Sequence, residues 1–235
     1  MRPGLEHHPA EARTVGDMRI VIAGGHGQIA LRLERLLAAR GYEVAGIVRD
    51  ARQSEDLRTV GAEPVVLDLE SASVEQVAKV LAGADAAVFA AGAGPGSGTE
   101  RKDTVDRGAA VLFADAAERA GVRRYLIVSS MGADAGRAGD EVFDAYLRAK
   151  GAADDDVRSR SGLDWTVLRP GSLTNDAGTG LVSLGVSTGR GPVPRDDVAA
   201  VLAELLETPS TAGLTLELVS GSVPVTVAVK DVAGN

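Results

Sequence analysis

Residues Met18–Ala30 read MRIVIAGGHGQIA, and this stretch decides the fold. Met18–Ala23 is apolar apart from one charge, which is the pattern of a strand buried on both faces. The strand leads directly into Gly24, Gly25 and Gly27, so a tight turn follows it.

A helix is predicted to begin at this glycine turn. Ile29, Leu33, Leu36 and Leu37 recur at helical spacing, and Gly41 stands where a left-handed residue would end the helix. A strand, glycine turn and helix in this order aim backbone N–H groups and the positive end of a helix dipole at one point. Such a point suits a pyrophosphate.

The glycine turn also has a purely structural interpretation, because a tight strand-to-helix connection occurs in many α/β proteins. Here a second strand, Glu43–Val48, follows the helix, so a complete strand–helix–strand unit is present. In such a unit Gly24 permits the turn, Gly27 lets phosphates approach, and the small Ala30 lets the helix lie against the strand. The complete unit favours dinucleotide binding.

Chain length limits the number of domains. The 235 residues suffice for one well-buried α/β domain but not for a full-sized partner domain. We expect a mobile N-terminal extension at 1–17, a single nucleotide-binding domain at 18–235, and within it a small annex on the substrate side at about 171–235.

Composition excludes several classes of function. The net charge of −8 argues against a nucleic-acid partner, and the chain has no cysteine for disulfides or thiolate chemistry. Two of the three histidines lie in the expected extension, so no metal site is expected. Without a membrane-length apolar run or a signal peptide, a cytoplasmic protein acting on a small molecule is expected, and its oligomeric state stays open.

The remaining chain alternates between strands and helices, which predicts a doubly wound parallel sheet with right-handed crossovers. The further strands are predicted at Pro64–Leu67, Ala84–Ala91, Tyr125–Val128, Asp164–Leu168, Leu214–Val219 and Val225–Val229. The further helices are predicted at Gln53–Val60, from the Ser73 and Gln76 capping box to Gly83, and at Thr104–Ala120, Val142–Arg158 and Asp196–Leu206.

Two glycine-rich segments are assigned to ligand binding. Gly92–Gly98 follows a buried strand, and it is either a flexible linker or, as sheet geometry favours, a loop at the edge of the cofactor. Ser172–Pro194 is long and rich in glycine, serine and threonine, so we assign this loop to the substrate side.

Tyr146 and Lys150 are candidate catalytic residues. They are four apart on one predicted helix, roughly 6 Å apart along its axis and on the same face. An ammonium there lowers the tyrosine pKa, which makes Tyr146 a usable acid or base. Ser130, at the end of a neighbouring strand, could hydrogen-bond the same substrate oxygen. The alternative is a tyrosine and a lysine on a solvated face.

Cofactor choice depends on the residues after the second strand. Arg49 suits an adenosine 2′-phosphate, which favours NADP, whereas Asp50 at the ribose would make NAD possible. Arg169 is equally compatible with a substrate contact and with a structural ion pair near Asp164 or Asp197.

The chain resembles the short atypical members of the short-chain dehydrogenase/reductase superfamily. The resemblance rests on Val21–Gly27, on Ser129 and Ser130, on Tyr-x-x-x-Lys at 146 to 150, and on the distinctive run Ser161–Gly171. Within the superfamily the chain is most similar to NAD(P)-binding proteins related to NmrA-type regulators and to biliverdin and flavin reductases. The resemblance implies a Rossmann fold.

The resemblance also implies roles for individual residues. Ser130, Tyr146 and Lys150 match the catalytic positions. Arg49 would meet the 2′-phosphate, Asp68 and Leu69 would flank the adenine, and the ribose would lie beside Ala91 and Gly92. The full set of implied cofactor-binding residues is Gly24, Gly25, His26, Gly27, Gln28, Ile29, Arg49, Asp68, Leu69, Ala90, Ala91, Gly92, Ser129, Lys150, Pro170 and Gly171.

Two classes of function fit these features. The first is an NADP-dependent oxidoreductase that passes hydride to a small carbonyl, quinone or flavin-type substrate, with Tyr146 as proton donor. The second is a non-catalytic dinucleotide sensor that changes a protein partner when the cofactor binds. A sugar-nucleotide epimerase is a weaker alternative, because the annex is short for a nucleotide sugar.

Overall fold

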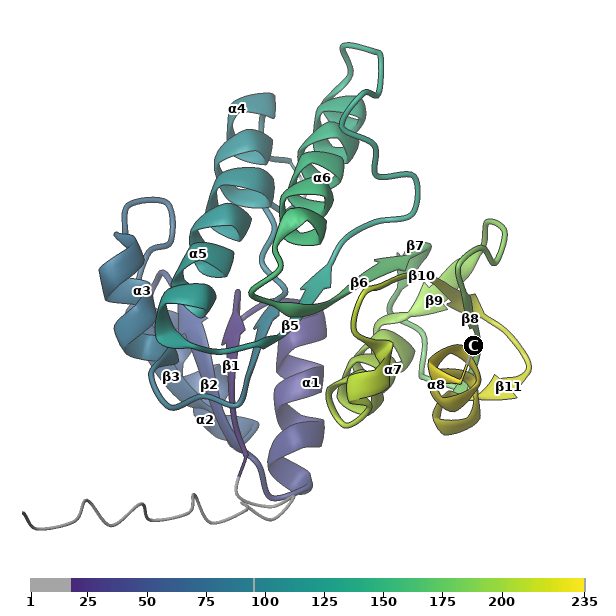
Figure 1. Ribbon diagram of the computed structural model, residues 1–235, viewed down its shortest axis with the longest axis horizontal. Helices are drawn as coiled ribbons and strands as arrows, with labels where there is room; N and C mark the ends of the chain where they lie inside the picture. The colour runs from purple at the N-terminus through teal and green to yellow at the C-terminus, as the bar shows by residue number, and fades with distance from the viewer. Residues whose placement is uncertain (1–17, 95, 235) are drawn as a thin grey trace, which may run out of the picture.

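The computed structural model describes residues 18–94 and 96–234. The extension expected at 1–17 lies outside these residues, as does Pro95 of the glycine-rich loop. A sheet of nine strands lies between helices on both of its faces (Figure 1). This arrangement confirms the predicted doubly wound α/β fold.

The strand order of the main sheet is β11-β8-β10-β6-β5-β4-β1-β2-β3. From β10 to β3 all neighbours pair in parallel, whereas β8 runs antiparallel to both β10 and β11. These strands are β1 (Arg19–Ala23), β2 (Glu43–Val48), β3 (Glu63–Val66), β4 (Ala86–Phe89), β5 (Arg124–Val128), β6 (Asp164–Pro170), β8 (Leu181–Gly185), β10 (Leu214–Ser220) and β11 (Val223–Pro224). A separate parallel pair is formed by β7 (Ser172–Thr174) and β9 (Pro192–Pro194).

The helices form a layer on each face of the sheet. One layer contains α1 (Gln28–Ala39), α2 (Ser54–Thr59), α7 (Arg195–Leu206) and α8 (Val225–Ala233). The opposite layer contains α3 (Val74–Leu81), α5 (Ala110–Ala120) and α6 (Val142–Ser159). Short helical turns are η2 (Ala51–Gln53), α4 (Thr99–Arg101) and η4 (Pro209–Thr211), and η3 (Lys102–Ala109) joins α4 to α5.

Alternation along β1 divides the core between the two faces. Ile20 and Ile22 pack with the α1 layer, and Val21 and Ala23 pack with the α3 layer, all without solvent exposure. Because β1 pairs with β2 on one side and β4 on the other, the chain reverses its winding at β1. In an open parallel sheet, ligands bind at the carboxyl ends of the strands beside this point.

The helix predicted at Thr104–Ala120 begins earlier than expected. Helical backbone starts at Thr99, and the eight residues Lys102–Ala109 adopt the wider π-helical turn before α5 begins. π-helical turns are rare and frequently occur at functional sites. This turn buries Lys102 and Asp106, two charged residues that the sequence interpretation did not single out.

The strand predicted at Val225–Val229 is wrong, because these residues form the start of α8. Their β-branched side chains favour a strand locally. However, Val225, Ala228 and Val229 are the buried positions, and this spacing of three and four is that of a helix face. The packing of α8 against α7 and the sheet therefore overrides the local preference.

The segment after β6 is more regular than a long loop. β7, β8 and β9 lie within Ser172–Pro194, and β8 joins the main sheet beside β10. Figure 1 shows these strands grouped with α7 and α8 at the C-terminal side of the molecule. Among the residues that the structure describes, no helix is long and apolar enough to cross a bilayer.

Glu34 is a buried acid on α1 beneath the glycine turn. Its side chain is fully buried, and neither carboxyl oxygen has a hydrogen-bond partner among the described residues. A Cβ at Gly46 would lie 2.5 Å from Glu34 Oε1, so a glycine in β2 makes room for this carboxyl. Burial raises the pKa of Glu34 from 4.5 to about 8.

We expect Glu34 to make stability depend on pH. Between pH 4.5 and about 8 the folded chain retains a proton that the unfolded chain releases, so the free energy of unfolding falls as pH rises through this window. Glu34→Gln should remove this loss and stabilise the protein at pH 8 by roughly 2 to 4 kcal/mol. Denaturant unfolding at pH 5 and pH 8 measures the effect. Glu63→Gln, a change at an exposed glutamate, is the control and should leave the pH dependence of stability unchanged. An identical pH dependence in wild type and Glu34→Gln would contradict the role of Glu34.

Candidate functional site

The turn after β1 requires glycine at its first position. Gly24 has a φ of +78°, and a Cβ there would lie 2.5 Å from the Ala91 Cα at the end of β4. Gly27 N–H donates to the Gly24 carbonyl over 2.8 Å, which closes the turn. The carboxyl ends of β1 and β4 are therefore in direct contact.

The N-terminus of α1 opens at this turn, and none of the described side chains caps it. Its N-cap residue, Gly27, offers no side-chain hydrogen bond, and the first turn of the helix contains no acidic residue. Gly27 and Gln28 are both exposed. An uncapped helix N-terminus that begins with exposed residues fits a diphosphate, so the residues present suit a dinucleotide.

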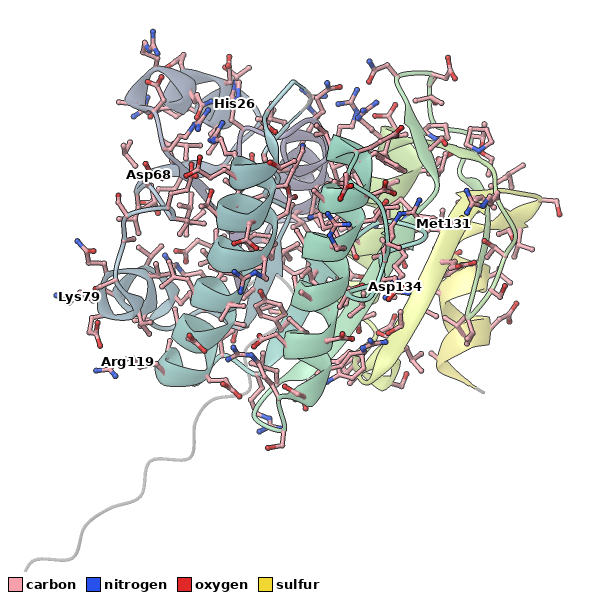
Figure 2. All side chains as sticks on the ribbon, turned by 90° about the horizontal axis from the view of Figure 1, so that it is seen from above. His26, Asp68, Lys79, Arg119, Met131 and Asp134 are labelled. Atoms are coloured by element: carbon pink, nitrogen blue, oxygen red, sulfur yellow. The ribbon has the colours of Figure 1, made fainter. Side chains whose placement is uncertain are left out.

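Two cavities meet at this turn. The smaller, of about 230 Å³, lies at the ends of β1, β2 and β3, and the larger, of about 710 Å³, extends toward α6. Both are lined by His26, Gly27 and Ala90–Ala93, so together they form one crevice across the sheet edge. Figure 2 shows His26 and Asp68, which line the smaller cavity, near the same edge of the molecule.

Most of the predicted cofactor-binding residues line this crevice. The smaller cavity includes Gly24, His26, Gly27, Arg49, Asp68, Leu69, Ala90, Ala91 and Gly92. The larger cavity adds Gln28, Ile29, Ser129, Tyr146 and Lys150. Four predicted residues line neither cavity, namely Gly25, Ser130, Pro170 and Gly171.

Those four residues have backbone contacts instead. Gly25 is buried and donates to the Ile47 carbonyl, and Gly171 donates to the Leu218 carbonyl. Pro170 is the buried last residue of β6. The Ser130 hydroxyl donates to the Met131 carbonyl over 3.4 Å. Their assigned roles stay predictions.

Arg49 lies beside an acid that the sequence interpretation missed. Arg49 Nη1 is 3.8 Å from Glu70 Oε2, and Arg101 Nη2 is 3.0 Å from the same oxygen. All three residues line the smaller cavity. The cavity thus carries two guanidinium groups and the carboxylates of Asp68 and Glu70. Glu70 follows β3, far in sequence from Arg49, so the local pattern gave no sign of their contact.

Asp50, the alternative ribose partner, is engaged elsewhere. Its carboxylate accepts from the Arg52 backbone at the N-terminus of η2 and pairs with the Arg52 guanidinium over 2.5 Å. The Arg52 hydrogen bonds lower the pKa of the Asp50 carboxyl to about 2. Asp50 does not line either cavity, whereas Arg49 does.

Tyr146 and Lys150 both face the larger cavity. The Lys150 Nζ lies 6.0 Å from the centre of the Tyr146 ring, as expected for residues four apart on one helix face. Lys150 is almost completely buried and donates to the Val128 carbonyl over 3.1 Å. The Tyr146 hydroxyl has no hydrogen-bond partner among the described residues and remains available to a ligand.

Lys150 has a buried counterion on η3. Asp106 Oδ1 lies 3.3 Å from its Nζ, and Asp106 Oδ2 accepts from the Ala93 N–H over 3.3 Å. Asp106 therefore ties the glycine-rich loop to the lysine. Sequence reasoning missed it, although an acid directly after the core residue Val105 was a detectable signal.

A second buried network lies behind the larger cavity. The Ser129 hydroxyl donates to Asp154 Oδ2 over 2.8 Å, and Arg169 Nη2 pairs with the same oxygen over 2.8 Å. Burial raises the pKa of Asp154, and Arg169 opposes that increase. Arg169 thus forms a structural ion pair, but with Asp154 rather than with Asp164 or Asp197.

The fold and the crevice define an NAD(P)-binding protein of the Rossmann type. Consistent with this, the chain belongs to the NAD(P)H-binding family, whose family model matches residues 24–209. The resemblance to atypical short-chain dehydrogenase/reductase proteins is confirmed at this level, and a nicotinamide dinucleotide is the cofactor of the family.

The chain is similar to bacterial proteins over nearly its whole length. It is 35% identical over 214 residues to the Bacillus subtilis protein named "Uncharacterized sugar epimerase YhfK", covering 91% of this chain and 99% of the relative. A solved structure from Bacillus halodurans, named "Putative NAD-dependent epimerase/dehydratase", is 36% identical with a TM-score of 0.84, covering 91% and 99%. The oxidoreductase ylbE from Lactococcus lactis is 25% identical with a TM-score of 0.80, covering 93% and 98%.

We expect Gly27→Val to abolish binding of NADH and NADPH. A Cβ at position 27 would lie 3.0 Å from the Gly24 carbonyl oxygen, and the branched side chain would cover the free N–H groups of α1. Calorimetric titration of a folded variant measures this loss. Gly185→Val in β8 is the matched control, because the nearest atom to its Cβ is 3.8 Å away. Unchanged affinity in Gly27→Val would mean that the phosphates bind elsewhere.

Proposed function

We propose that this chain is an NADP-dependent oxidoreductase that passes hydride to a small carbonyl, quinone or flavin-type substrate. The observation that carries the proposal is the position of Tyr146, which lines the same cavity as Gly27 of the glycine turn and whose hydroxyl has no hydrogen-bond partner among the described residues. The similar Lactococcus lactis protein, named an oxidoreductase, supports the same class of reaction.

Some residues of the crevice would bind the cofactor, and others would transfer the proton. Gly24, Gly27 and the N-terminus of α1 would hold the diphosphate, and a bound nicotinamide would supply the hydride. The Tyr146 hydroxyl would donate a proton to the substrate oxygen that gains charge. Lys150, held by Asp106 and by the Val128 carbonyl, keeps a positive charge near the Tyr146 ring.

The preference for NADP rests on the guanidinium groups of the smaller cavity. Arg49 and Arg101 carry two positive charges and Asp68 and Glu70 carry two negative ones, so the preference comes from charge-assisted hydrogen bonds of the guanidinium groups to a 2′-phosphate and not from net charge. Asp50 pairs with Arg52 and lines neither cavity, which supports Arg49 rather than Asp50 as the residue that meets the 2′ position.

An epimerase is the second candidate, because two similar proteins carry that name. Such an enzyme removes hydride from a sugar and returns it to the same molecule, so it causes no net NADPH oxidation. The proposed oxidoreductase consumes NADPH in proportion to the substrate reduced. Following NADPH absorbance with carbonyls, quinones and flavins separates the two reactions.

We expect Tyr146→Phe to lower turnover by roughly 10² to 10⁴-fold while NADPH affinity stays unchanged. The variant removes only the proton-donating hydroxyl and keeps the ring. Tyr42→Phe is the matched control, because its hydroxyl contacts Glu207 and does not line the crevice. If Tyr146→Phe reduces substrate at the wild-type rate, the proton comes from another group. Absence of turnover with every substrate would favour the dinucleotide sensor.

We expect Arg49→Ala to weaken NADPH binding by roughly 1.5 to 3 kcal/mol, the range for hydrogen bonds to charged groups, and to leave NADH binding nearly unchanged. Titration of both dinucleotides measures this difference. Arg119→Ala, a distant surface residue on α5 in Figure 2, is the control. Equal losses for both dinucleotides would contradict the 2′-phosphate contact, and loss of NADH binding in Glu70→Gln would support NAD.

A further inference from the structure

We propose that the substrate of the larger cavity is an anion with a planar apolar body, and that Lys102 and Arg195 bind its charge. This inference rests on the proposed function only in taking the larger cavity as the substrate site. It names a chemical class of substrate, an aromatic or conjugated carboxylate or phosphate, from the side chains that line the cavity.

Lys102 is a buried cation for which the described residues provide no counterion. Only 8% of the residue is exposed, and its Nζ donates to the neutral Gly94 carbonyl over 2.8 Å. The same Nζ lies 5.3 Å from the centre of the Tyr146 ring. No carboxylate lies within ion-pair distance of it in the part of the chain that the structure describes. A buried charge without a partner is costly, and an anionic ligand would compensate it.

Arg195 adds a second cation at the start of α7. Its Nη1 donates to the Asn175 amide oxygen over 2.8 Å, and within the described ranges it forms no ion pair. Lys102 and Arg195 come from opposite helix layers but line the same cavity. Both cations therefore border the same cavity.

The charge of the larger cavity contrasts with that of the whole chain. Asp106 is the single carboxylate among the lining residues, and Lys150 already neutralises it at 3.3 Å. Lys102 and Arg195 thus leave a net positive cavity in a protein whose net charge is −8. A concave site of opposite sign to its surroundings concentrates anions.

Apolar side chains form the other wall of the cavity. Phe143 is 58% exposed and stacks on Tyr146 with ring centres 6.0 Å apart and planes inclined by 28°. Val142 and Leu173, which also line the cavity, are 48% and 39% exposed. Such an exposed apolar group beside a few polar atoms is typical of a ligand site, and the stacked rings suit a planar body.

The test compares two ligands that differ only in charge. The full chain is saturated with NADP⁺, and binding of 2-naphthoate and of neutral 2-naphthamide is measured by calorimetry. Wild type should bind naphthoate about tenfold or more tightly than naphthamide, because an ion pair replaces a neutral contact. Lys102→Met should bring the two affinities within about threefold of each other, while Lys102→Arg should preserve the preference.

Control variants separate this site from the cofactor site and from folding defects. Lys79→Met changes an exposed lysine that points outward from α3 in Figure 2, and should leave the preference intact. Arg195→Gln should also reduce the preference for naphthoate over naphthamide. The inference can therefore be tested with this variant if Lys102→Met fails to fold. NADP⁺ affinity of each variant is measured first and should equal that of wild type.

Three results would overturn the inference. The first is a wild type that binds both probes equally or binds neither. The second is an unchanged preference in Lys102→Met and Arg195→Gln. The third is a loss of NADP⁺ affinity in Lys102→Met with the preference retained, which would assign the lysine to the cofactor. The test measures binding and not turnover, so its outcome is independent of the proposed reductase activity. A protein without reductase activity can still show the charge preference, and an active reductase can lack it.

Discussion

The close approach of three strand ends around the glycine turn is the constraint on which the rest of the structure depends. A Cβ at Gly24 would lie 2.5 Å from Ala91, and a Cβ at Gly25 would lie 2.9 Å from the Gly46 Cα in β2. With glycine at these positions, β1, β2 and β4 meet at one edge without side chains between them. This contact leaves α1 to begin directly at the crevice, where no side chain of the described residues caps its first turn.

Buried ion pairs hold the opposite wall of the crevice. Lys150 and Asp154 lie one turn apart on α6, and each is paired with a charge from another element, Asp106 of η3 and Arg169 of β6. These pairs tie α6 to its neighbours on both sides. Because breaking a buried pair leaves an uncompensated charge, they keep α6 in one place and Tyr146 at the cavity.

Local patterns predicted most elements and failed where packing reversed a local preference. The continuous apolar run predicted β1, the strand–helix–strand pattern predicted β2, and the Ser73 and Gln76 capping box is present at the start of α3. Val225–Val229 was misassigned because β-branched residues favour strands, while the burial of Val225, Ala228 and Val229 on one helix face comes from α7 and the sheet. The early helix start at Thr99 was missed because the charges in Lys102–Ala109 obscured its helical pattern.

The sequence by itself determined the glycine turn, the order of strands from β1 to β6 with the main helices between them, and the shared helix face of Tyr146 and Lys150, because each depends on residues close together in the chain. Only the tertiary structure decided which charges meet. Asp106 is distant in sequence from Lys150, as Glu70 is from Arg49, and Lys102 and Arg195 come from different helix layers. Spacing along a helix or strand dictates local contacts, whereas contacts between elements depend on how the sheet brings its strand ends to one edge.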